Sequence, residues 1–382
     1  MSMPVSVSFI FIFAIWMSTA RAAELPEYGL SVKGLGMGNA YTLHARGHDA
    51  VSYNPAAFAR MEGFQFRLMG LGMGLNGVDS FDEYEAIFNN SNNVGATLNA
   101  LYGEPIWARI DYQASLSAGP FIAGAYARNN LGFTLLNPAL PYLETNFYSD
   151  IVLFGGAGVQ IIPNIFDVGF MAKRITRYAG AGDITASTLA FLNSNIIENS
   201  ANQTGVAYGF DFGAKLTLPG DWNPSVAFAW QDIGDTKFSF SATNPAPKKI
   251  QDRMNVGVGM EKDFMGIAKL RPALEFKMLN GSSSEVQIGK RLHMGLELEL
   301  PLLTLRGGFN QGYYTYGASF DFWVFQVDVA SYGVELGEYV GQHEDRRYMI
   351  QLTMDFGVDP KSGDWFNFSK SRQNSRRLKQ RR

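Results

Sequence analysis

The stretch TYGASFDFWVFQVDVASYG, residues 315–333, alternates between apolar and polar side chains. In its first half Phe320 and Phe322 flank Asp321, and in its second half two valines flank Asp328. Period-2 alternation on both sides of a short pivot is typical of a β-hairpin with one apolar and one polar face. The apolar face of such a hairpin meets either the core of a soluble sandwich or the lipid around a membrane barrel.

The composition favours a β-rich protein with an apolar exterior. The chain has 382 residues and a formal net charge of -3, and only 18% of its residues are charged, whereas an average soluble domain has about 25%. Aromatic residues make up 14%, and there are 41 glycines. Cysteine is absent, which excludes disulfide bonds and thiolate chemistry.

The same alternation recurs along most of the chain after Gly63. It is clearest at residues 206–220 (VAYGFDFGAKLTLPG), 253–261 (RMNVGVGME) and 346–356 (RRYMIQLTMDF). Strands of about ten residues suit a tilted membrane barrel, whereas sandwich strands usually have about five or six. The pattern predicts an all-β protein, a transmembrane antiparallel β-barrel of about 14 strands.

Long and tight connections are expected to alternate between these strands. The long ones are predicted at residues 77–109, 180–203, 239–250 and 335–345. The tight ones include ARNN (127–130), DFMG (263–266) and FWV (322–324). Outer-membrane barrels have short periplasmic turns and longer outer loops, so this asymmetry favours the membrane reading. A strand expected to start near Ser284 would place Lys290 against lipid.

The N-terminus resembles an export signal. The apolar run Val5–Trp16 is too short to span a bilayer, and Ala20-Arg21-Ala22 follows it as a cleavage signal. Residues 1–22 are therefore predicted to be a signal peptide. No later apolar run is long enough for a transmembrane helix, and the predicted location is the outer membrane of a Gram-negative-type bacterium.

Residues 23–62 do not alternate and precede the barrel predicted at 63–358. A barrel of about 14 strands lies between those filled by side chains and the open porins, so it needs a plug. We predict that residues 23–62 form an N-terminal hatch. Residues 359–382, which are rich in lysine and arginine, are predicted to be a basic periplasmic tail.

The run GLGMGNAYTLHARGHDAVSYNPAAFARM resembles the hatch of the FadL/TodX-type outer-membrane transporters of hydrophobic compounds and their PorV-like relatives. Those proteins share Gly-Met-Gly-x-Ala, then Asp-Ala, then Asn-Pro-Ala before the first strand. The resemblance implies a fourteen-stranded barrel with a periplasm-facing hatch. It implies hatch and ligand-binding roles for Gly36, Met37, Gly38, Asp49, Asn54, Pro55 and Ala56.

Two of the predicted long loops have apolar residues at helical spacing. Such helices either cap the barrel mouth or form an apolar groove where a ligand first lands. The groove residues would be Phe81, Tyr84, Phe88, Leu189, Leu192 and Ile196.

Charged residues on the polar strand faces have mixed sign, whereas a strongly ion-selective pore should show a ring of one sign. We therefore expect a network across the lumen that holds the plug by hydrogen bonds and ion pairs. The expected plug anchors are Asp211, Arg253, Arg271, Asp321 and Asp328.

No constellation indicates catalysis or a cofactor. His44 and His48 are four residues apart, but no third metal ligand is visible and Gly47 weakens a helix. His293 is the one histidine in a predicted strand, and no serine partner is indicated. The chain is predicted to have no catalytic residue, no metal and no cofactor, and not to be an enzyme.

Two functions remain open. The first is passive uptake of hydrophobic small molecules such as fatty acids, in which movement of the hatch passes the ligand inward. The alternative is a non-transporting PorV-like scaffold or protein-delivery barrel of an envelope secretion or assembly system. The expected partners are outer-membrane lipid and a hydrophobic ligand, with an envelope protein or cell-wall polymer on the basic tail, and no nucleic acid.

Overall fold

The computed structural model describes residues 31–77, 102–137, 142–185, 203–239, 245–280, 287–322, 324–359 and 364–367. The predicted signal peptide, the six predicted groove residues and most of the predicted tail lie outside these ranges. No helix within the described ranges is long and apolar enough to cross a bilayer.

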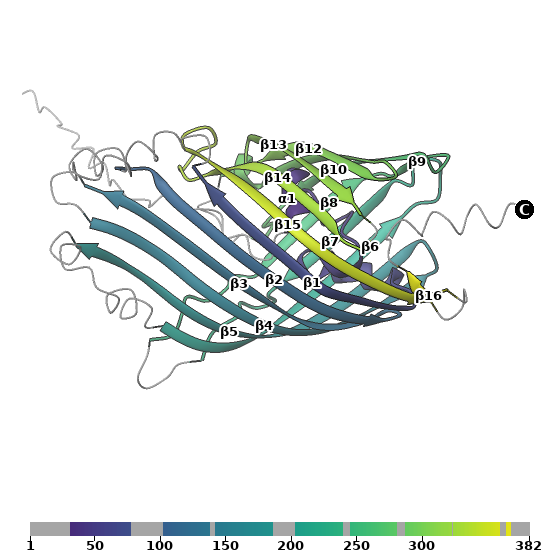
Figure 1. Ribbon diagram of the computed structural model, residues 1–382, viewed down its shortest axis with the longest axis horizontal. Helices are drawn as coiled ribbons and strands as arrows, with labels where there is room; N and C mark the ends of the chain where they lie inside the picture. Colours follow the sequence, from purple (N-terminus) through teal and green to yellow (C-terminus); the bar gives the residue numbers. More distant parts are fainter. Residues whose placement is uncertain are drawn as a thin grey trace, which may run out of the picture.

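The described strands form one antiparallel sheet that closes on itself (Figure 1), because β1 pairs with β15. The ring is a closed barrel of 14 strands, as predicted. The other two strands, β9 and β16, each pair with one barrel strand. The strands are β1 (Phe64–Asn76), β2 (Pro105–Ala118), β3 (Phe121–Leu136), β4 (Tyr142–Ile162), β5 (Phe166–Thr185), β6 (Gln203–Thr217), β7 (Ser225–Gln231), β8 (Arg253–Gly259), β9 (Lys262–Phe264), β10 (Ala268–Phe276), β11 (Leu292–Glu299), β12 (Leu303–Asn310), β13 (Tyr313–Asp321), β14 (Gln326–Glu335), β15 (Glu344–Asp359) and β16 (Asp364–Asn367). The short helices are α1 (Val32–Gly36), η1 (Gly47–Ser52), η2 (Pro55–Arg60) and α6 (Ile288–Arg291).

The hairpin at residues 315–333 consists of β13 and β14. Ser319 pairs with Asp328 across the ladder, and the amide of Phe322 donates to the carbonyl of Phe325 (2.8 Å) in the tight turn. Phe320 is 44% exposed, whereas Asp328 is fully buried. The apolar face of the hairpin is therefore the outer surface of the barrel, and the polar face lines the lumen.

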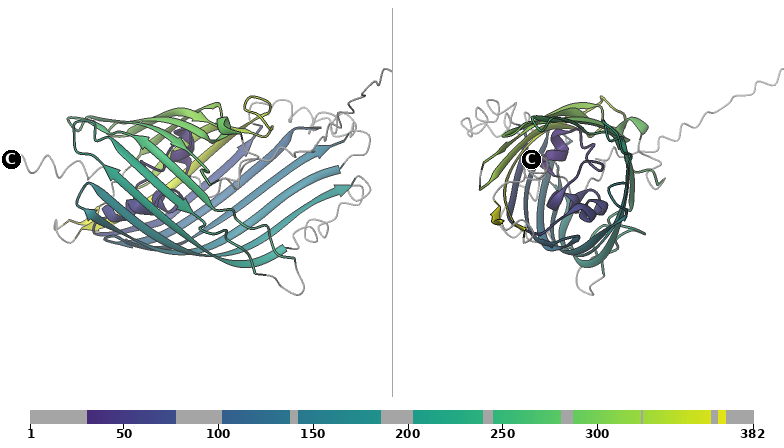
Figure 2. Two further views of the ribbon diagram at one scale, coloured as in Figure 1. Left: turned by 180° about the vertical axis from the view of Figure 1, so that it is seen from behind. Right: turned by 90° about the vertical axis from the view of Figure 1, so that its right-hand side faces the viewer.

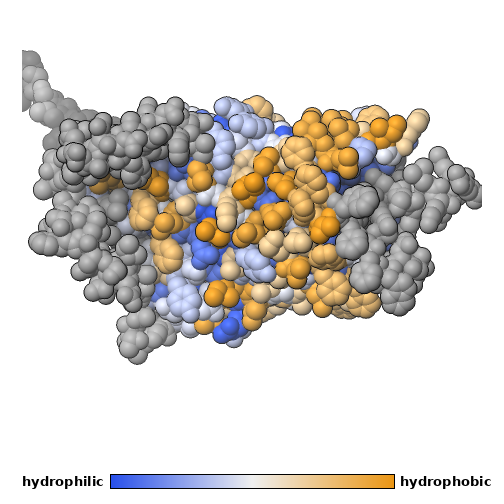
Figure 3. Space-filling model, viewed as in Figure 1, coloured by the Kyte–Doolittle hydropathy of each residue, from blue (hydrophilic) through white to orange (hydrophobic). Residues whose placement is uncertain are grey.

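The outer surface shows the same division on other strands. Large exposed apolar side chains alternate with buried polar ones, and orange apolar residues cover much of the face in Figure 3. Exposed aromatic residues near the short turns are Phe64, Phe66, Phe121, Trp222, Phe264, Phe320, Phe322 and Phe325. Exposed tyrosines farther toward the long-loop end are Tyr112, Tyr178, Tyr208, Tyr314 and Tyr316. Two aromatic girdles around an apolar band and a polar interior are typical of a membrane-spanning barrel.

The wall is higher on one side than on the other. The strands β2 to β6 have 14 to 21 residues, whereas β7 and β8 have 7 each. Figure 1 shows the long blue and teal strands extending well beyond the green ones. The strands therefore depart in both directions from the length of about ten residues expected from the alternation.

Two predicted boundaries are also wrong. The segment ARNN (127–130) is not a turn, because β3 runs through it and the turn falls at Gly119, where φ is +56°. Arg128 faces the lumen and Asn129 the outside, so alternation continues through a polar run that resembles a turn. The predicted strand from Ser284 begins at Leu292, and Lys290 is buried in α6, where its Nζ donates to the carbonyl of Gly337 (2.9 Å).

The described N-terminal residues, 31–62, lie inside the barrel, as the end-on view in Figure 2 shows, and the side view in the same figure places them near the short-turn end. We call them the inner segment. They bring α1 against β13 and β14, and η2 against β4 and β5. The inner segment thereby contacts opposite sides of the wall.

Candidate functional site

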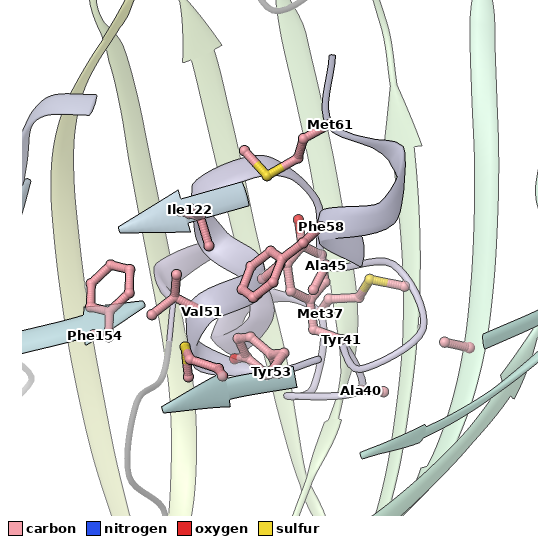
Figure 4. Close-up of a cluster of buried hydrophobic side chains, with 13 residues drawn as sticks. Met37, Ala40, Tyr41, Ala45, Val51, Tyr53, Phe58, Met61, Ile122 and Phe154 are labelled. Carbon is pink, nitrogen blue, oxygen red and sulfur yellow. The ribbon is translucent and has the colours of Figure 1, made fainter. Parts of the chain in front are cut away.

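The inner segment folds around its own apolar side chains. Asn54 precedes Pro55, and its side-chain oxygen accepts from the amide of Ala56 (3.0 Å), which caps η2. Figure 4 shows Tyr53 and Phe58 in a buried cluster that extends to Ile122 of the barrel wall. The segment and the wall therefore share one apolar core.

Glycines on the lumen face leave room for the backbone of the inner segment. A Cβ at Gly169 would lie 2.1 Å from the carbonyl oxygen of Pro55, and one at Gly295 would lie 2.2 Å from that of Met37. Gly38 adopts a φ of +64°, which glycine tolerates at no steric cost. The other wall glycines that would collide with the segment are Gly156, Gly158, Gly213, Gly259, Gly308 and Gly317.

Buried ion pairs join the inner segment to β1. Arg67 donates through NH1 to Asp49 (2.7 Å) and through Nε to Asp355 of β15 (2.8 Å). Asp49 also accepts from Lys33 Nζ (2.9 Å). Burial alone would lower the pKa of Lys33, but the carboxylates of Asp328 and Asp49 outweigh it and raise that pKa. The lysine therefore stays charged inside the barrel.

A second set of contacts joins the segment to the opposite wall. Arg60 donates to Asp167 (2.5 Å), and Arg46 donates to Glu297 (2.9 Å). Arg271 shares Glu297 with Arg46, at 2.6 Å. The side chains of Arg46 and Arg60 are 41% and 32% exposed, but the carboxylates that they meet are buried, so removing either arginine would take a partner from a buried charge.

The predicted hatch residues all lie in this region. The Thr315 hydroxyl lies 2.9 Å from the amide of Gly38 and 3.2 Å from the carbonyl of Gly36. Met37, Pro55 and Ala56 pack against the wall glycines, and Asp49 forms the ion pairs described above. The sequence did not single out Lys33, Arg46 or Arg60, although three basic residues in a plug beside lumen carboxylates were a usable signal.

The predicted plug anchors separate into three groups. Asp328 accepts from Ser319 and lies 3.9 Å from Lys33 Nζ, and Arg271 reaches Arg46 through Glu297. Asp321 lies at the end of β13, where its amide donates to the carbonyl of Leu302 (3.0 Å). Asp211 and Arg253 contact a different element, which includes residues 239–250, predicted from the sequence as a long outer loop.

That element is the β7–β8 connector, residues 232–252, whose described parts fold into the lumen. Asp232 accepts from Lys173 Nζ (2.8 Å) and from Arg253 (3.0 Å), and its amide donates to Asp211 (2.8 Å). Phe238 is 9% exposed and packs within the barrel. Two elements, the inner segment and the connector, therefore occupy the lumen.

Glycines of β6 also leave room for this connector. A Cβ at Gly205 would lie 2.8 Å from the Cβ of Phe238, and one at Gly209 would lie 2.8 Å from the Thr236 hydroxyl. Gly213 on the same strand face contacts Asn54 of the inner segment. One strand thus carries successive glycine sites for both elements.

Two cavities adjoin the inner segment. The first, about 30 Å³ and so large enough for one or two water molecules, is lined by residues of the inner segment, β1, β2, β3 and β15, including Asp49 and Asp111. The second, about 20 Å³, lies between the inner segment and the connector. Ser52, Tyr126 and Arg128 line both, and we call the two cavities together the lumen chamber. Its lining is rich in charged groups, so it is not a purely apolar pocket.

The barrel wall is irregular beside the first cavity. β1 slips in register against both neighbours around Leu68, which is 60% exposed on the outer surface. The carbonyl of Leu68 accepts from the Tyr112 hydroxyl (3.2 Å). Gly70 and Gly72, just past this bulge, line the cavity. The wall is therefore thin and locally unpaired where the chamber meets it.

The histidines serve as hydrogen-bonding partners. His293 Nδ1 lies 3.0 Å from the carbonyl of Gly38, and His48 Nδ1 lies 2.7 Å from the Ser115 hydroxyl. Across the described part of the chain, no group of three His, Asp or Glu side chains is arranged to hold a metal ion.

No protein-family model and no curated protein matches the chain. Among solved structures, the toluene transporter TbuX of Ralstonia pickettii matches 86% of this chain and 98% of its own, with a TM-score of 0.50 and 14% identity. A FadL homologue of Pseudomonas aeruginosa matches 91% and 100%, with a TM-score of 0.49 and 10% identity. The Pseudomonas putida toluene transporter TodX matches 88% and 98%, with a TM-score of 0.47 and 11% identity. The match with TbuX establishes a shared barrel fold, and what this barrel transports has to be argued from its own residues.

Proposed function

We propose that the protein is an outer-membrane barrel for passive uptake of hydrophobic small molecules such as fatty acids. The observation that carries the proposal is the narrow cavity between the inner segment and the β1 bulge, where the wall ladder is interrupted. A membrane-spanning barrel with a chamber against a thin wall offers a route from the lumen into the surrounding lipid. The shared fold with a toluene transporter also supports a role in the uptake of hydrophobic molecules.

The contacts of the inner segment favour a sideways route over an axial one. Axial passage requires that Arg67–Asp49 and Arg60–Asp167 separate inside the barrel. Sideways passage requires local opening at Leu68, where the ladder is already interrupted. The second route disrupts fewer buried charges, so we assign the exit to the β1 bulge.

Filling the first cavity tests this route. A Cβ at Gly72 would lie 3.6 Å from the Cβ of Asp111, an ordinary contact, so Gly72→Leu should fold and occupy the cavity. We expect its uptake of toluene or oleate into liposomes to fall to the rate of protein-free liposomes. Gly307→Leu on β12 is the matched control, because a Cβ there meets nothing closer than 3.8 Å. Equal uptake by Gly72→Leu and Gly307→Leu would rule out this exit.

A non-transporting scaffold or protein-delivery barrel is the second candidate, and the dense buried contacts of the inner segment favour it. In that case the wild-type barrel would give no uptake above protein-free liposomes. Affinity capture with the full chain and with a chain lacking residues 360–382 would then recover specific envelope partners only from the full chain.

A further inference from the structure

Arg174 is a charged side chain on the lipid-facing surface of the barrel. It lies on β5 next to the buried lumen residue Lys173, and its own side chain is exposed on the outside. Within the described ranges it has no hydrogen-bonding or ion-pair partner. Arg346, on the outer face of β15, instead pairs with Glu344, and its guanidinium carbon lies 4.0 Å from the ring centre of Tyr314. Among the described residues, Arg174 therefore presents an uncompensated positive charge to the bilayer.

The height of Arg174 on the barrel places it near the outer edge of the apolar band. β5 begins at Phe166, at the short-turn end, and Arg174 follows eight residues later. At about 3.3 Å per residue and a tilt of about 40°, this is a rise of roughly 20 Å, within an apolar band of about 25 Å. A charge on the lipid face is costly at the middle of the bilayer and much less costly near its interfaces. Arg174 therefore lies at the level where the lipid headgroups of the long-loop side begin.

Tyr208 supplies a second donor beside Arg174. The two residues are direct partners in the β5–β6 ladder, so their Cβ atoms lie roughly 5 Å apart on the same face. Tyr208 is 66% exposed, and its hydroxyl has no hydrogen-bonding partner in the part of the chain that the structure describes. A guanidinium can donate to two oxygens of a phosphate at once, and a neighbouring hydroxyl can donate to a third. The pair is therefore suited to hold a phosphate group at the membrane surface.

An apolar surface continues from this pair toward the middle of the bilayer. Phe170 and Phe210 lie on the same outer face, nearer the short turns, and their rings are stacked with centres 5.9 Å apart. They are 49% and 46% exposed, so lipid chains can reach both. Donors at the headgroup level, next to aromatic rings at the chain level, match the two parts of one lipid molecule.

We propose that the outer face of β5 and β6 binds a phosphate-bearing lipid of the leaflet on the long-loop side. Its phosphate lies between Arg174 and Tyr208, and an acyl chain lies along Phe170 and Phe210. The unpaired positive charge favours an anionic lipid over a neutral one, because the headgroup supplies the missing partner. The site is separate from the lumen, so the inference holds for an uptake barrel and for a scaffold alike.

Native mass spectrometry of the full-length barrel in detergent tests the site. We expect the wild type to retain dioleoyl phosphatidate, whereas dioleoylglycerol, which has the same chains without the phosphate, should bind about tenfold more weakly or worse. Arg174→Gln should weaken phosphatidate binding by a similar factor, because the charge-assisted pair is lost. Tyr208→Phe should weaken it by a smaller factor. Both side chains are exposed and have no partner among the described residues, so the variants should fold as the wild type does.

Lys262→Gln is the matched control, because it removes one positive charge at the short-turn end, where Lys262 pairs with Asp221 (3.3 Å). This variant should retain phosphatidate as the wild type does. An equal concentration of inorganic phosphate should not displace the lipid, because it cannot use the apolar surface at Phe170 and Phe210. Phosphatidate binding that Arg174→Gln leaves unchanged, or that Lys262→Gln weakens equally, would overturn the proposal, and so would displacement by inorganic phosphate.

Discussion

At the scale of single residues, the lumen is organised by charged side chains that water does not reach. Arg67, Asp49 and Glu297 are each less than 6% exposed, yet each has a partner from a distant part of the chain. His44 differs, because it is buried as a neutral base. Its Nε2 lies 3.2 Å from the carbonyl of Pro272, which requires the proton on that nitrogen.

Acid should loosen the inner segment through His44. Burial chiefly, and then the charge of Lys215, lower the His44 pKa to about 3, while its bond to Pro272 and the charge of Glu297 oppose this. In an undocked segment the pKa should be about 6.5, so the undocked state binds more protons. Docking is then strongest above pH 6.5 and weakens as the pH falls toward 3. At pH 5 the loss should be about 2 kcal/mol.

Thiol labelling of a buried reporter can measure this loss. Ala45→Cys, in the apolar cluster of the inner segment, is introduced into both the wild type and His44→Gln. Thiol ionisation changes with pH equally in both proteins. The wild-type labelling rate divided by the His44→Gln rate, compared between pH 7.5 and pH 5, therefore reports docking of the inner segment. The wild-type rate should rise relative to His44→Gln at pH 5, and a ratio that does not change with pH would contradict the assignment.

The alternation of the sequence predicts which face a residue occupies, but not which residue it meets. It correctly placed Asp328 in the lumen, because period 2 fixes the face of a strand residue. It could not pair Arg67 with Asp49 and Asp355, because the latter contact spans 288 residues and depends on closure of the ring. The connector was missed for the same reason, since its buried contacts with Lys173 and Phe210 form only after the wall is assembled.

At the scale of elements, the fit between the inner segment and the wall depends on strands that lack side chains where helices approach. η2 lies against β4, β5 and β6. The glycines at these contacts have no alternation signal of their own, so the sequence pattern could predict the strands but not the helix sites on them. At residues 127–130 the polar run inside β3 misled the prediction in another way, because this part of the strand was predicted to be a turn.

A single methyl group should disturb the site of η2. Gly169→Ala would place its Cβ 2.1 Å from the carbonyl oxygen of Pro55, and overpacking of this kind costs about 1–3 kcal/mol. We expect trypsin to cleave faster after Arg60 in this variant. In Gly132→Ala the nearest atom is 3.5 Å away, so cleavage should remain as in the wild type. Equal protection of the two variants would show that the contact at Gly169 does not hold η2.

At the scale of the whole molecule, the chain forms a closed wall with two elements inside it. Counting the alternating segments predicted the number of strands. Pairing each strand with its antiparallel neighbours in the sequence gives their order in the ring. The position of the proposed passage did not follow from the sequence. It depends on a register slip in β1 that shifts the alternation by one residue and leaves no compositional trace.

A reversible tether can distinguish sideways from axial passage. The Cβ of Leu43 lies 3.7 Å from the position of a Cβ at Gly257, within the range for a disulfide, and the chain has no other cysteine. In Leu43→Cys/Gly257→Cys the oxidised protein should take up oleate as fast as the reduced protein, because sideways exit leaves the inner segment in place. Uptake lost on oxidation and restored by dithiothreitol would instead indicate axial passage.

The unequal height of the wall has a consequence for the surrounding bilayer. Seven residues at about 3.3 Å each, tilted by about 40°, rise roughly 18 Å, which is less than the apolar band of about 25 Å that such barrels usually present. Next to β7 and β8 the strands alone therefore fall short of the hydrocarbon thickness, whereas β4 and β5, with 21 and 20 residues, exceed it. The resulting hydrophobic mismatch should thin and disorder the lipids on one flank and lean the whole barrel toward it. The membrane around this protein is then itself asymmetric, with a compressed flank and an uncompressed one.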